Sequence, residues 1–140
     1  MSKIWITSDL HIGHNKEFLY ESRGFQTVEE HDKTLVSNWN DLVDKEDIVY
    51  VLGDVMLKHS LEDDDFSYGL EILKQLKGNM VIIRGNHDSE AKIEKYKTCS
   101  NVSSAGDAAL YLNYPATGSY HFYLSHYPTL DAHEMKLMST

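Results

Sequence analysis

The apolar residues of this chain form short runs and helix-like repeats that alternate along the sequence. The short runs predict strands over residues 3–8, 48–52 and 80–83, and the last two have the pattern of strands buried on both faces. Between these runs, apolar residues recur at helical spacing over residues 28–43 and 64–77. The order strand, helix, strand, helix, strand predicts an α/β layered domain.

Polar residues mark the ends of the two predicted helices. Thr27, with Glu30 three positions later, has the form of a capping box at the start of the first helix. The acidic stretch 62–65 lies at the start of the second helix, where negative charge interacts favourably with the helix dipole. Gly78 is placed as the residue that follows and ends this helix.

The last part of the chain has a different pattern. Residues 109–114 and 120–124 alternate between apolar and polar positions, and residues 115–119 between them are rich in turn formers. This predicts an antiparallel hairpin, with only a short helical segment between it and the strand over residues 80–83.

Composition narrows the classes of protein that fit. The 140 residues, 41% of them hydrophobic, suit one compact domain, which is expected to extend over residues 1–140. The net charge of −9 at pH 7 repels phosphate backbones and counts against tight polynucleotide binding. A phosphate-bearing substrate therefore needs local positive charge, from a few basic side chains or from metal cations that acidic residues hold.

The cysteine content and the hydropathy pattern indicate a compartment. Cys99 is the only cysteine, which excludes an internal disulfide and a cysteine-rich zinc site. The N-terminal residues lack a signal-peptide core, and no apolar run approaches the length of a membrane span. A cytoplasmic protein without a membrane partner is therefore expected.

Polar clusters follow the predicted strands. Asp9 and His11 come after the first strand, Asp54 after the second, residues 86–88 after the third and His126 after the last. In open α/β sheets ligands bind outside the carboxyl ends of the strands, so these clusters should converge in space. Each cluster alone is composed of residues that are common in turns. Turns alone, however, would not explain why every one of these strands is followed by such a cluster.

These clusters supply only oxygen and imidazole ligands. Such a set suits Mn²⁺, Fe²⁺, Zn²⁺, Co²⁺ or Ni²⁺ better than Ca²⁺, which prefers oxygen alone, or Cu⁺, which prefers sulfur. Asp9 and His11 are two positions apart, and residues at this spacing that leave a strand point to the same side. Both side chains are therefore expected to meet one ion, in a type of site that holds two.

The clusters also carry a family resemblance in their order and strand context, through Asp9-Leu10-His11, Gly53-Asp54-Val55, Gly85-Asn86-His87-Asp88 and His126. With these segments the chain resembles the calcineurin-like metallophosphoesterases over nearly its whole length. Residues 8–14 and 124–128 are similar to segments of small phage and bacterial phosphoesterases of that superfamily. The resemblance implies a layered α/β/β/α metallophosphoesterase sandwich.

The resemblance implies a role for each residue of the clusters. Asp9 and His11 would bind a first metal ion, Asp54 would bridge two ions, and Asn86 and His126 would bind the second. Two divalent ions are expected, with Mn²⁺ first and Fe, Zn, Ni, Co or Mg as alternatives. Such a pair polarises phosphoryl oxygens while a water of lowered pKa attacks in line.

By the same resemblance, two residues would act on the substrate rather than on the metal ions. His87 would stabilise charge on the phosphate or protonate the leaving oxygen. Asp88 would be a catalytic residue that orients His87.

One element of the family pattern does not occur. The family normally ends with a Gly-His-x-His motif, and after His126 the only histidine here is His133, without the preceding glycine or the second histidine. The chain is therefore expected to be C-terminally truncated relative to the family, and each metal shell would need water or a stand-in ligand.

The expected function is metal-dependent hydrolysis of a phosphate ester, a phosphodiester rather than a phosphomonoester, in a small phosphorylated or nucleotide-like substrate. Two alternatives stay open. One is a catalytically impaired metal- or nucleotide-binding remnant, which the absent histidines favour. The other is a nuclease, against which the acidic composition counts.

Three further residues are candidates for binding the substrate, each beside an ordinary structural alternative. His14 can hydrogen-bond a phosphate, Arg23 can pair with one through two parallel hydrogen bonds, and Tyr127 can stack on a nucleobase. His31 and His59 lie on or near the predicted helices and are expected to face solvent.

Overall fold

The computed structural model describes most of the chain, namely residues 3–13, 21–56, 64–86, 88–106, 110–114 and 120–127. Within this part, strands and helices alternate from the N-terminus. The strands are β1 (Ile4–Thr7), β2 (Ile48–Val51), β3 (Asn79–Ile83) and β4 (Val102–Gly106), and the helices between them are α2 (Val28–Leu42), α3 (Asp64–Lys74) and α4 (Glu90–Tyr96).

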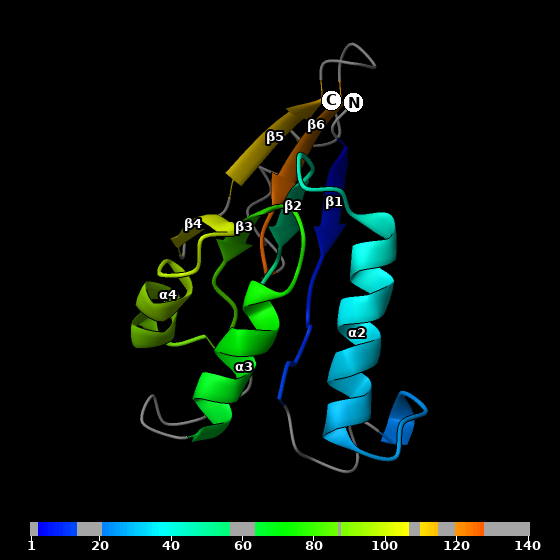
Figure 1. Ribbon diagram of the computed structural model, residues 1–140. Coiled ribbons are helices and arrows are strands. Elements are labelled where there is room, and N and C mark those ends of the chain that lie inside the picture. Colours follow the sequence, from blue (N-terminus) through cyan, green and yellow to red (C-terminus); the bar gives the residue numbers. More distant parts are fainter. Residues whose placement is uncertain are drawn as a thin grey trace.

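The four strands form one parallel sheet in the order β1-β2-β3-β4. Figure 1 shows the helices following the same order across the molecule, from α2 beside β1 to α4 beside β4. A parallel strand needs a crossover connection, which the helices provide. The predicted α/β class is confirmed, and every strand of this sheet ends at the same edge.

A hairpin completes the described structure. β5 (Leu110–Tyr114) pairs antiparallel with β6 (Tyr120–Leu124), and Leu110 is opposite Leu124. The predicted hairpin is confirmed within one residue at its start. Its function in the fold is to bring the chain after β6 back to the sheet edge.

The core lies on one face of the parallel sheet. Val49, Val51, Met80 and Ile82 are at most 1% exposed and belong to one cluster with apolar residues of all three helices. On β1 the alternate positions point away from this cluster, and Ile6 is 48% exposed. The alternation follows from the period of two of a strand.

Two features differ from the sequence prediction. The sequence predicts no strand over residues 102–106, because Val-Ser-Ser-Ala-Gly lacks an apolar run. This segment nevertheless forms β4, because it pairs with β3 and packs against α4. The second helix ends at Lys74 rather than at residue 77. Side chains of α2 hold the segment after Lys74, since Asn40 Nδ2 donates to Gln75 O and Trp39 Nε1 donates to Lys77 O.

The other end signals behave as predicted where the structure describes them. Thr27 caps α2, and its Oγ1 accepts a hydrogen bond from Glu30 N at 3.1 Å. Gly78 has a φ of +100°, the left-handed conformation expected of a residue that redirects the chain after a helix. No helix in the described part of the chain is long and apolar enough to cross a membrane.

A buried carboxylate fixes the start of the sheet. Asp47 accepts hydrogen bonds from Lys3 N at 2.8 Å, Trp5 Nε1 at 2.9 Å and Asp44 N at 2.9 Å. These donors, the Asp44 amide first, hold the pKa of Asp47 below its ordinary value of 3.8. The ionised carboxylate therefore ties β1 to the turn before β2.

The lowered pKa of Asp47 gives stability a pH dependence of known sign. The contribution is fully present above pH 3.8 and is lost as the pH falls below that value, because the folded state resists protonation of Asp47. We predict that Asp47→Asn lowers the free energy of unfolding at pH 7, and that its deficit against wild type shrinks below pH 3.8.

Urea unfolding at several pH values measures this difference. Asp41→Asn, at an exposed carboxylate of α2, is the matched control and should leave the pH dependence unchanged. A constant deficit of Asp47→Asn across the pH range would contradict the assignment.

Candidate metal centre

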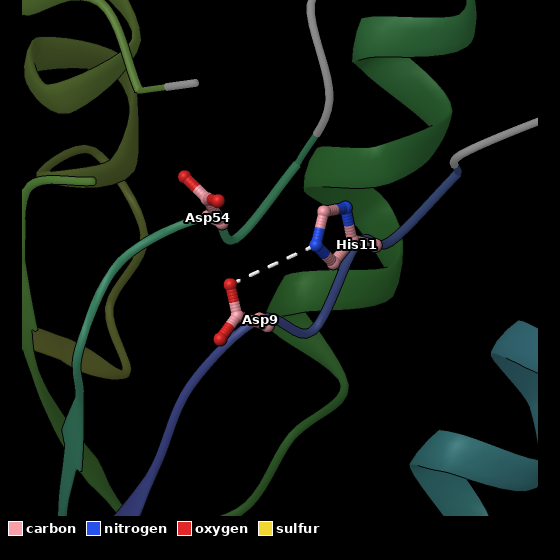
Figure 2. A group of neighbouring side chains, drawn as sticks. All are labelled: Asp9, His11 and Asp54. Atoms are coloured by element: carbon pink, nitrogen blue, oxygen red, sulfur yellow. Dashed lines mark ion pairs between the residues drawn. The ribbon is translucent and has the colours of Figure 1, made fainter. Parts of the chain in front are cut away.

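The segments that follow β1 and β2 stay paired beyond the ends of the strands. Asp9 N donates to Gly53 O at 3.1 Å, His11 N donates to Asp54 O at 3.1 Å, and Ile12 N donates to Val55 O at 2.9 Å. This continued pairing places Asp9 and His11 beside Asp54, as Figure 2 shows. Residues more than forty positions apart in the sequence thus form one group.

The backbone at these positions is left-handed. Asp9, His11 and Asp54 have φ values of 56°, 52° and 54°, and they are the only residues besides glycine with positive φ in the described part of the chain. Such a conformation costs on the order of 1–3 kcal/mol per residue and occurs mostly where the surrounding structure imposes it. Asp9 and His11 do come together as expected, but their left-handed backbone, rather than the alternation of a strand, directs the two side chains.

The three side chains form a carboxylate–imidazole–carboxylate group. One ligand atom from each lies within 4.8 Å of the others, and His11 Nε2 is 3.8 Å from Asp9 Oδ1. Asp54 is buried, while half of the Asp9 side chain is exposed. Oxygen and imidazole donors at this spacing fit a divalent cation of the Mn²⁺, Fe²⁺ or Zn²⁺ type.

His126 lies on the other side of Asp54. Its Nδ1 is 2.7 Å from Leu52 O, and its Nε2 is 2.8 Å from Asn86 Oδ1 and 3.8 Å from Asp54 Oδ2. Because a carbonyl only accepts, Nδ1 carries the proton, and in the neutral ring Nε2 presents a lone pair toward Asn86 Oδ1. A histidine whose other nitrogen is held by a carbonyl is typical of a metal ligand.

Two glycines allow the loops to come this close. A Cβ on Gly53 would lie 2.6 Å from both Gly85 Cα and His126 Nδ1. A Cβ on Gly85 would lie 2.6 Å from Asp54 N. No side chain fits at either position, so the glycines before Asp54 and Asn86 are required by the backbone approach itself.

Asp88 joins the loops that follow β2 and β3. It is 1% exposed, and its Oδ2 accepts hydrogen bonds from Asp54 N at 2.7 Å and Gly85 N at 2.9 Å. Its Oδ1 accepts from Tyr96 Oη at 3.1 Å and from Val55 N at 3.3 Å. The structure thus gives this carboxylate backbone partners, and its predicted action on His87 stays a prediction because His87 lies outside the described residues.

Two residues of α4 that the sequence did not single out surround Asp88. Lys92 is 3% exposed, and burial lowers the pKa of its ammonium although Asp88 and Asp54 favour the charged form. Burial first, and the Asp88 carboxylate next, raise the pKa of Tyr96, which therefore stays a hydroxyl donor. Lys92 and Tyr96 are four positions apart on a helix that Ser89 caps, and this spacing is the sequence signal that both side chains lie on the same face of α4.

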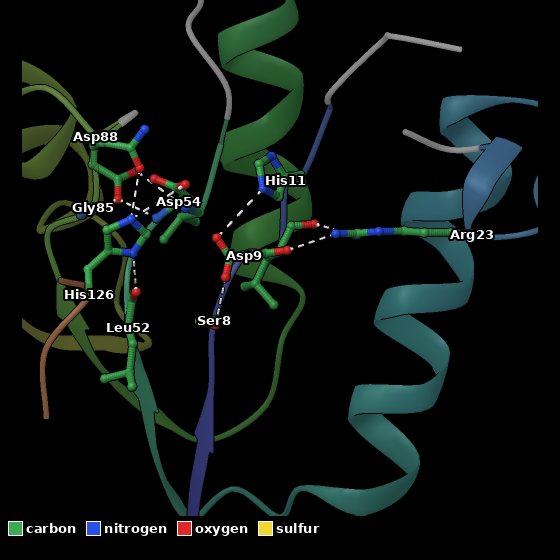
Figure 3. Close-up of polar contacts among 12 residues, drawn as sticks. Ser8, Asp9, His11, Arg23, Leu52, Asp54, Gly85, Asp88 and His126 are labelled. Atoms are coloured by element: carbon green, nitrogen blue, oxygen red, sulfur yellow. Dashed lines mark hydrogen bonds and ion pairs between the residues drawn. The ribbon is translucent and has the colours of Figure 1, made fainter. Parts of the chain in front are cut away.

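Arg23 and His31 lie beside the segment that carries Asp9 and His11. Arg23 Nη2 donates to Asp9 O at 3.1 Å and Nη1 donates to Leu10 O at 3.4 Å, so the guanidinium contacts backbone carbonyls of the site (Figure 3). His31 is 4% exposed, and the expectation that it faces solvent is wrong. Its position three after Val28 and four before Leu35 places it on the apolar face of α2, and this spacing is a sequence signal for burial.

Of the remaining substrate-binding candidates, the structure describes only Tyr127. Tyr127 is 55% exposed, with its ring edge-on to His126 at 4.9 Å between centroids. Beside it is an open cavity of about 270 Å³ lined by Arg84, Gly85, Asn86 and Tyr127. His14, His59 and His133 lie outside the described residues.

Comparison with known proteins assigns the family. The model of the calcineurin-like phosphoesterases matches residues 2–136. The chain belongs to this family. Its members bind divalent metal ions and act on phosphoric esters, which agrees with the resemblance in the sequence and with the group of Asp9, His11 and Asp54.

Relatives of this chain occur in archaea and phages. An uncharacterised protein of Methanocaldococcus jannaschii is 44% identical over 88 residues, which are 63% of this chain and 48% of that protein. The Gene 66 protein of Mycobacterium phage L5 is 34% identical, over 95% of this chain and 67% of the phage protein. The chain thus spans about half the length of the first relative and two thirds of the second.

A solved structure shares the fold. A protein of unknown function from Aquifex aeolicus superimposes with a TM-score of 0.67 and 21% sequence identity, over 99% of this chain and 70% of that one. At this identity the likeness concerns the fold alone.

The hydrogen bonds of Asp88 generate a stability prediction. Asp88→Asn replaces one acceptor oxygen with an NH₂ group, which leaves either the two amides at Oδ2 or the two donors at Oδ1 without their acceptor. It should lower the free energy of unfolding by about 3 kcal/mol. Tyr96→Phe removes a single donor and should cost about 1 kcal/mol. Chemical denaturation of both variants measures the difference, and equal effects would mean that the backbone partners of Asp88 contribute little.

Proposed function

We propose that this domain hydrolyses phosphodiesters at a centre of two divalent metal ions around Asp54. The observation that supports the proposal most is the position of Asp54 between two sets of ligand atoms. Asp9 and His11 lie on one side within 4.8 Å, and His126 Nε2 is 3.8 Å away on the other. A carboxylate shared by two sets of donors is the arrangement that two-metal hydrolysis needs.

The residues divide into two ligand sets. Asp9 and His11 would hold one ion, Asn86 and His126 the other, and Asp54 both. When bound, the ions supply Lewis-acid chemistry that polarises the phosphoryl oxygens and lowers the pKa of a water. We propose Mn²⁺ as the ion, because mixed carboxylate and imidazole donors suit it and the donor set contains no thiolate.

The protein itself orients the ligands and the substrate. The Leu52 carbonyl holds the His126 ring so that Nε2 points to Asn86 and Asp54. His87, in the segment between Asn86 and Asp88, is proposed to stand beside the phosphate and to protonate the leaving oxygen. His14 is proposed as a further hydrogen-bond donor to the phosphate.

The cavity next to Asn86 supports the choice of a diester. Its lining includes the Arg84 and Tyr127 side chains, a cation and an exposed ring, beside the second ligand set. A diester has a second substituent that must lie somewhere near the metal ions, and a ring such as a nucleobase would stack on Tyr127. We propose a small nucleotide-like substrate in the cytoplasm rather than a polynucleotide, since the net charge of −9 repels a long phosphate backbone.

Activity against model esters tests the proposal. In Mn²⁺ the protein should hydrolyse bis(4-nitrophenyl) phosphate faster than 4-nitrophenyl phosphate, and a chelator should abolish both reactions. His87→Ala should lower turnover about 100-fold with its bound Mn²⁺ unchanged, because His87 is assigned to the substrate. Steady-state kinetics and elemental analysis provide the two measurements.

The possible outcomes separate the alternatives. Metal binding without turnover in any divalent ion would indicate an impaired remnant. Faster cleavage of the monoester would overturn the diester preference, and loss of metal from His87→Ala would overturn its role.

The two ligand sets also predict unequal affinities. Asp9 and His11 add a carboxylate to the shared Asp54, whereas Asn86 and His126 add no charge, so the first ion should bind more tightly. Calorimetric titration with Mn²⁺ should show one tight and one weak ion. Asp9→Asn should weaken the tight ion about tenfold or more, while His126→Ala removes only the weak one.

Two equally tight ions in the wild type would contradict this prediction. So would a greater loss of the tight ion in His126→Ala than in Asp9→Asn.

A further inference from the structure

A chain of polar contacts links α2 to the segment that carries Asp9 and His11. Asp32 Oδ1 is 2.9 Å from His31 Nδ1, and His31 Nε2 is 2.8 Å from Arg23 Nη1. Nη1 also donates to the carbonyl of Leu10, and Nη2 donates to the carbonyl of Asp9, as Figure 3 shows for Arg23. None of these three side chains belongs to the ligand sets.

Each hydrogen bond in this chain has one possible direction. A guanidinium only donates, so His31 Nε2 accepts from Arg23. The neutral ring then carries its proton on Nδ1 and donates to Asp32 Oδ1. The three side chains therefore support one another in a single arrangement.

Asp32 also holds the far end of the same segment. Its Oδ2 accepts a hydrogen bond from Gly13 N at 3.0 Å. The chain of contacts thus grips residues 9–13 on both sides of His11, at the carbonyls of Asp9 and Leu10 and at the amide of Gly13. The left-handed conformations of Asp9 and His11 lie within this grip.

The inner part of the network is rigidly packed. Asp32 is fully buried and His31 is 4% exposed, with the Phe25 ring edge-on to His31 at 5.5 Å. Tyr68 of α3 donates a hydrogen bond to Asp32, and partial burial together with the negative charge of Asp32 raises the pKa of Tyr68 to about 12. The exposed Arg23 is therefore held on one side by a buried histidine that is itself bound to a buried carboxylate.

Electrostatics alone does not explain a cation at this place. A guanidinium bound to the backbone of Asp9 repels a metal ion at the Asp9 carboxylate. Its hydrogen bonds, in contrast, stabilise a backbone conformation that costs on the order of 1–3 kcal/mol per residue. Charge and geometry thus predict opposite effects of Arg23 on metal binding.

We propose that Arg23, His31 and Asp32 form a positioning network that holds the left-handed turn of residues 9–13 and so presents Asp9 and His11 to a divalent cation. The effect on metal affinity rests on the proposed function, whereas the effect on the turn does not. Arg23 acts here as a positioning residue, and its expected role in binding the substrate phosphate stays a prediction.

Substitution of Arg23 tests the sign. In Arg23→Met, loss of charge alone would tighten Mn²⁺ binding, while loss of the hydrogen bonds should weaken it about tenfold. Arg23→Lys keeps the charge but not the two-pronged donor, and should still lose most of that affinity. Lys74→Met, at an exposed lysine of α3 paired with Glu71, is the matched control and should bind Mn²⁺ as the wild type does.

Titration calorimetry measures these affinities. Binding by Arg23→Met as tight as wild type, or tighter, would overturn the positioning of the ligands. Full affinity in Arg23→Lys would show that the charge at this position suffices and that the hydrogen-bond geometry of the guanidinium is not needed.

Amide hydrogen exchange of the metal-free protein tests the turn directly. In Arg23→Met the amides of His11 and Gly13 should exchange about tenfold faster, because their bonds to Asp54 O and Asp32 Oδ2 depend on the turn. The amide of Met80, bonded to Asn101 O, is the internal reference and should not change. Unchanged exchange at His11 and Gly13 would overturn the network.

The two measurements separate this proposal from the proposed function. A wild-type protein that binds no Mn²⁺ would refute the proposed metal centre. Hydrogen exchange would still decide whether Arg23 holds the turn. Arg23 is exposed, so its variants are expected to fold; Tyr68→Phe, which removes only the α3 donor to Asp32, provides a second variant in which exchange at Gly13 should rise.

Discussion

The edge of the sheet that carries the candidate ligands is held together by the carboxylate of Asp88. Parallel strands end at this edge with backbone amides that have no partner in the next strand, and such groups must be satisfied when they are buried. Asp88 accepts the amides of Asp54, Val55 and Gly85 on one carboxylate. The loops after β2 and β3 can then meet closely enough for Gly53 and Gly85 to touch, and Asp54, Asn86 and His126 come together as a result.

A carboxylate this deep needs hydrogen-bond and charge partners inside the protein. Tyr96 donates to it directly, and the buried ammonium of Lys92 lies close enough to favour both Asp88 and Asp54 electrostatically. Both partners come from α4, which also packs against β4. The short helix therefore stabilises the candidate site although it contributes no ligand. Removing one partner of a buried charge pair costs ~3–5 kcal/mol.

The sequence predicts those features that depend on local pattern. Apolar runs identify β1, β2 and β3, alternation identifies the hairpin, and the polar residues after each strand identify Asp9, His11, Asp54, Asn86 and His126 as neighbours. It does not predict features decided by distant partners. β4 has no apolar run and is defined by pairing with β3, and whether the donors of Arg23 face a phosphate or a carbonyl depends on a turn that the sequence alone does not fold. The left-handed backbone at Asp9 and His11 is of the same kind, since tertiary hydrogen bonds impose it.

The basic side chains near the site share one use. Arg23 donates to the carbonyls of Asp9 and Leu10, Lys92 to that of Met56 at 3.5 Å, and Arg84 to that of Asp88 at 2.7 Å. Each carbonyl lies outside the four strands of the parallel sheet, and a carbonyl that is shielded from water needs a donor. These hydrogen bonds direct the cationic groups to the main chain, while the carboxylates of Asp9 and Asp54 and the imidazole of His11 face one another. Because the nearby basic side chains bind the main chain, the acidic side chains form a negative cluster at the sheet edge. Such a cluster attracts a metal ion, and it attracts a phosphate only through that ion.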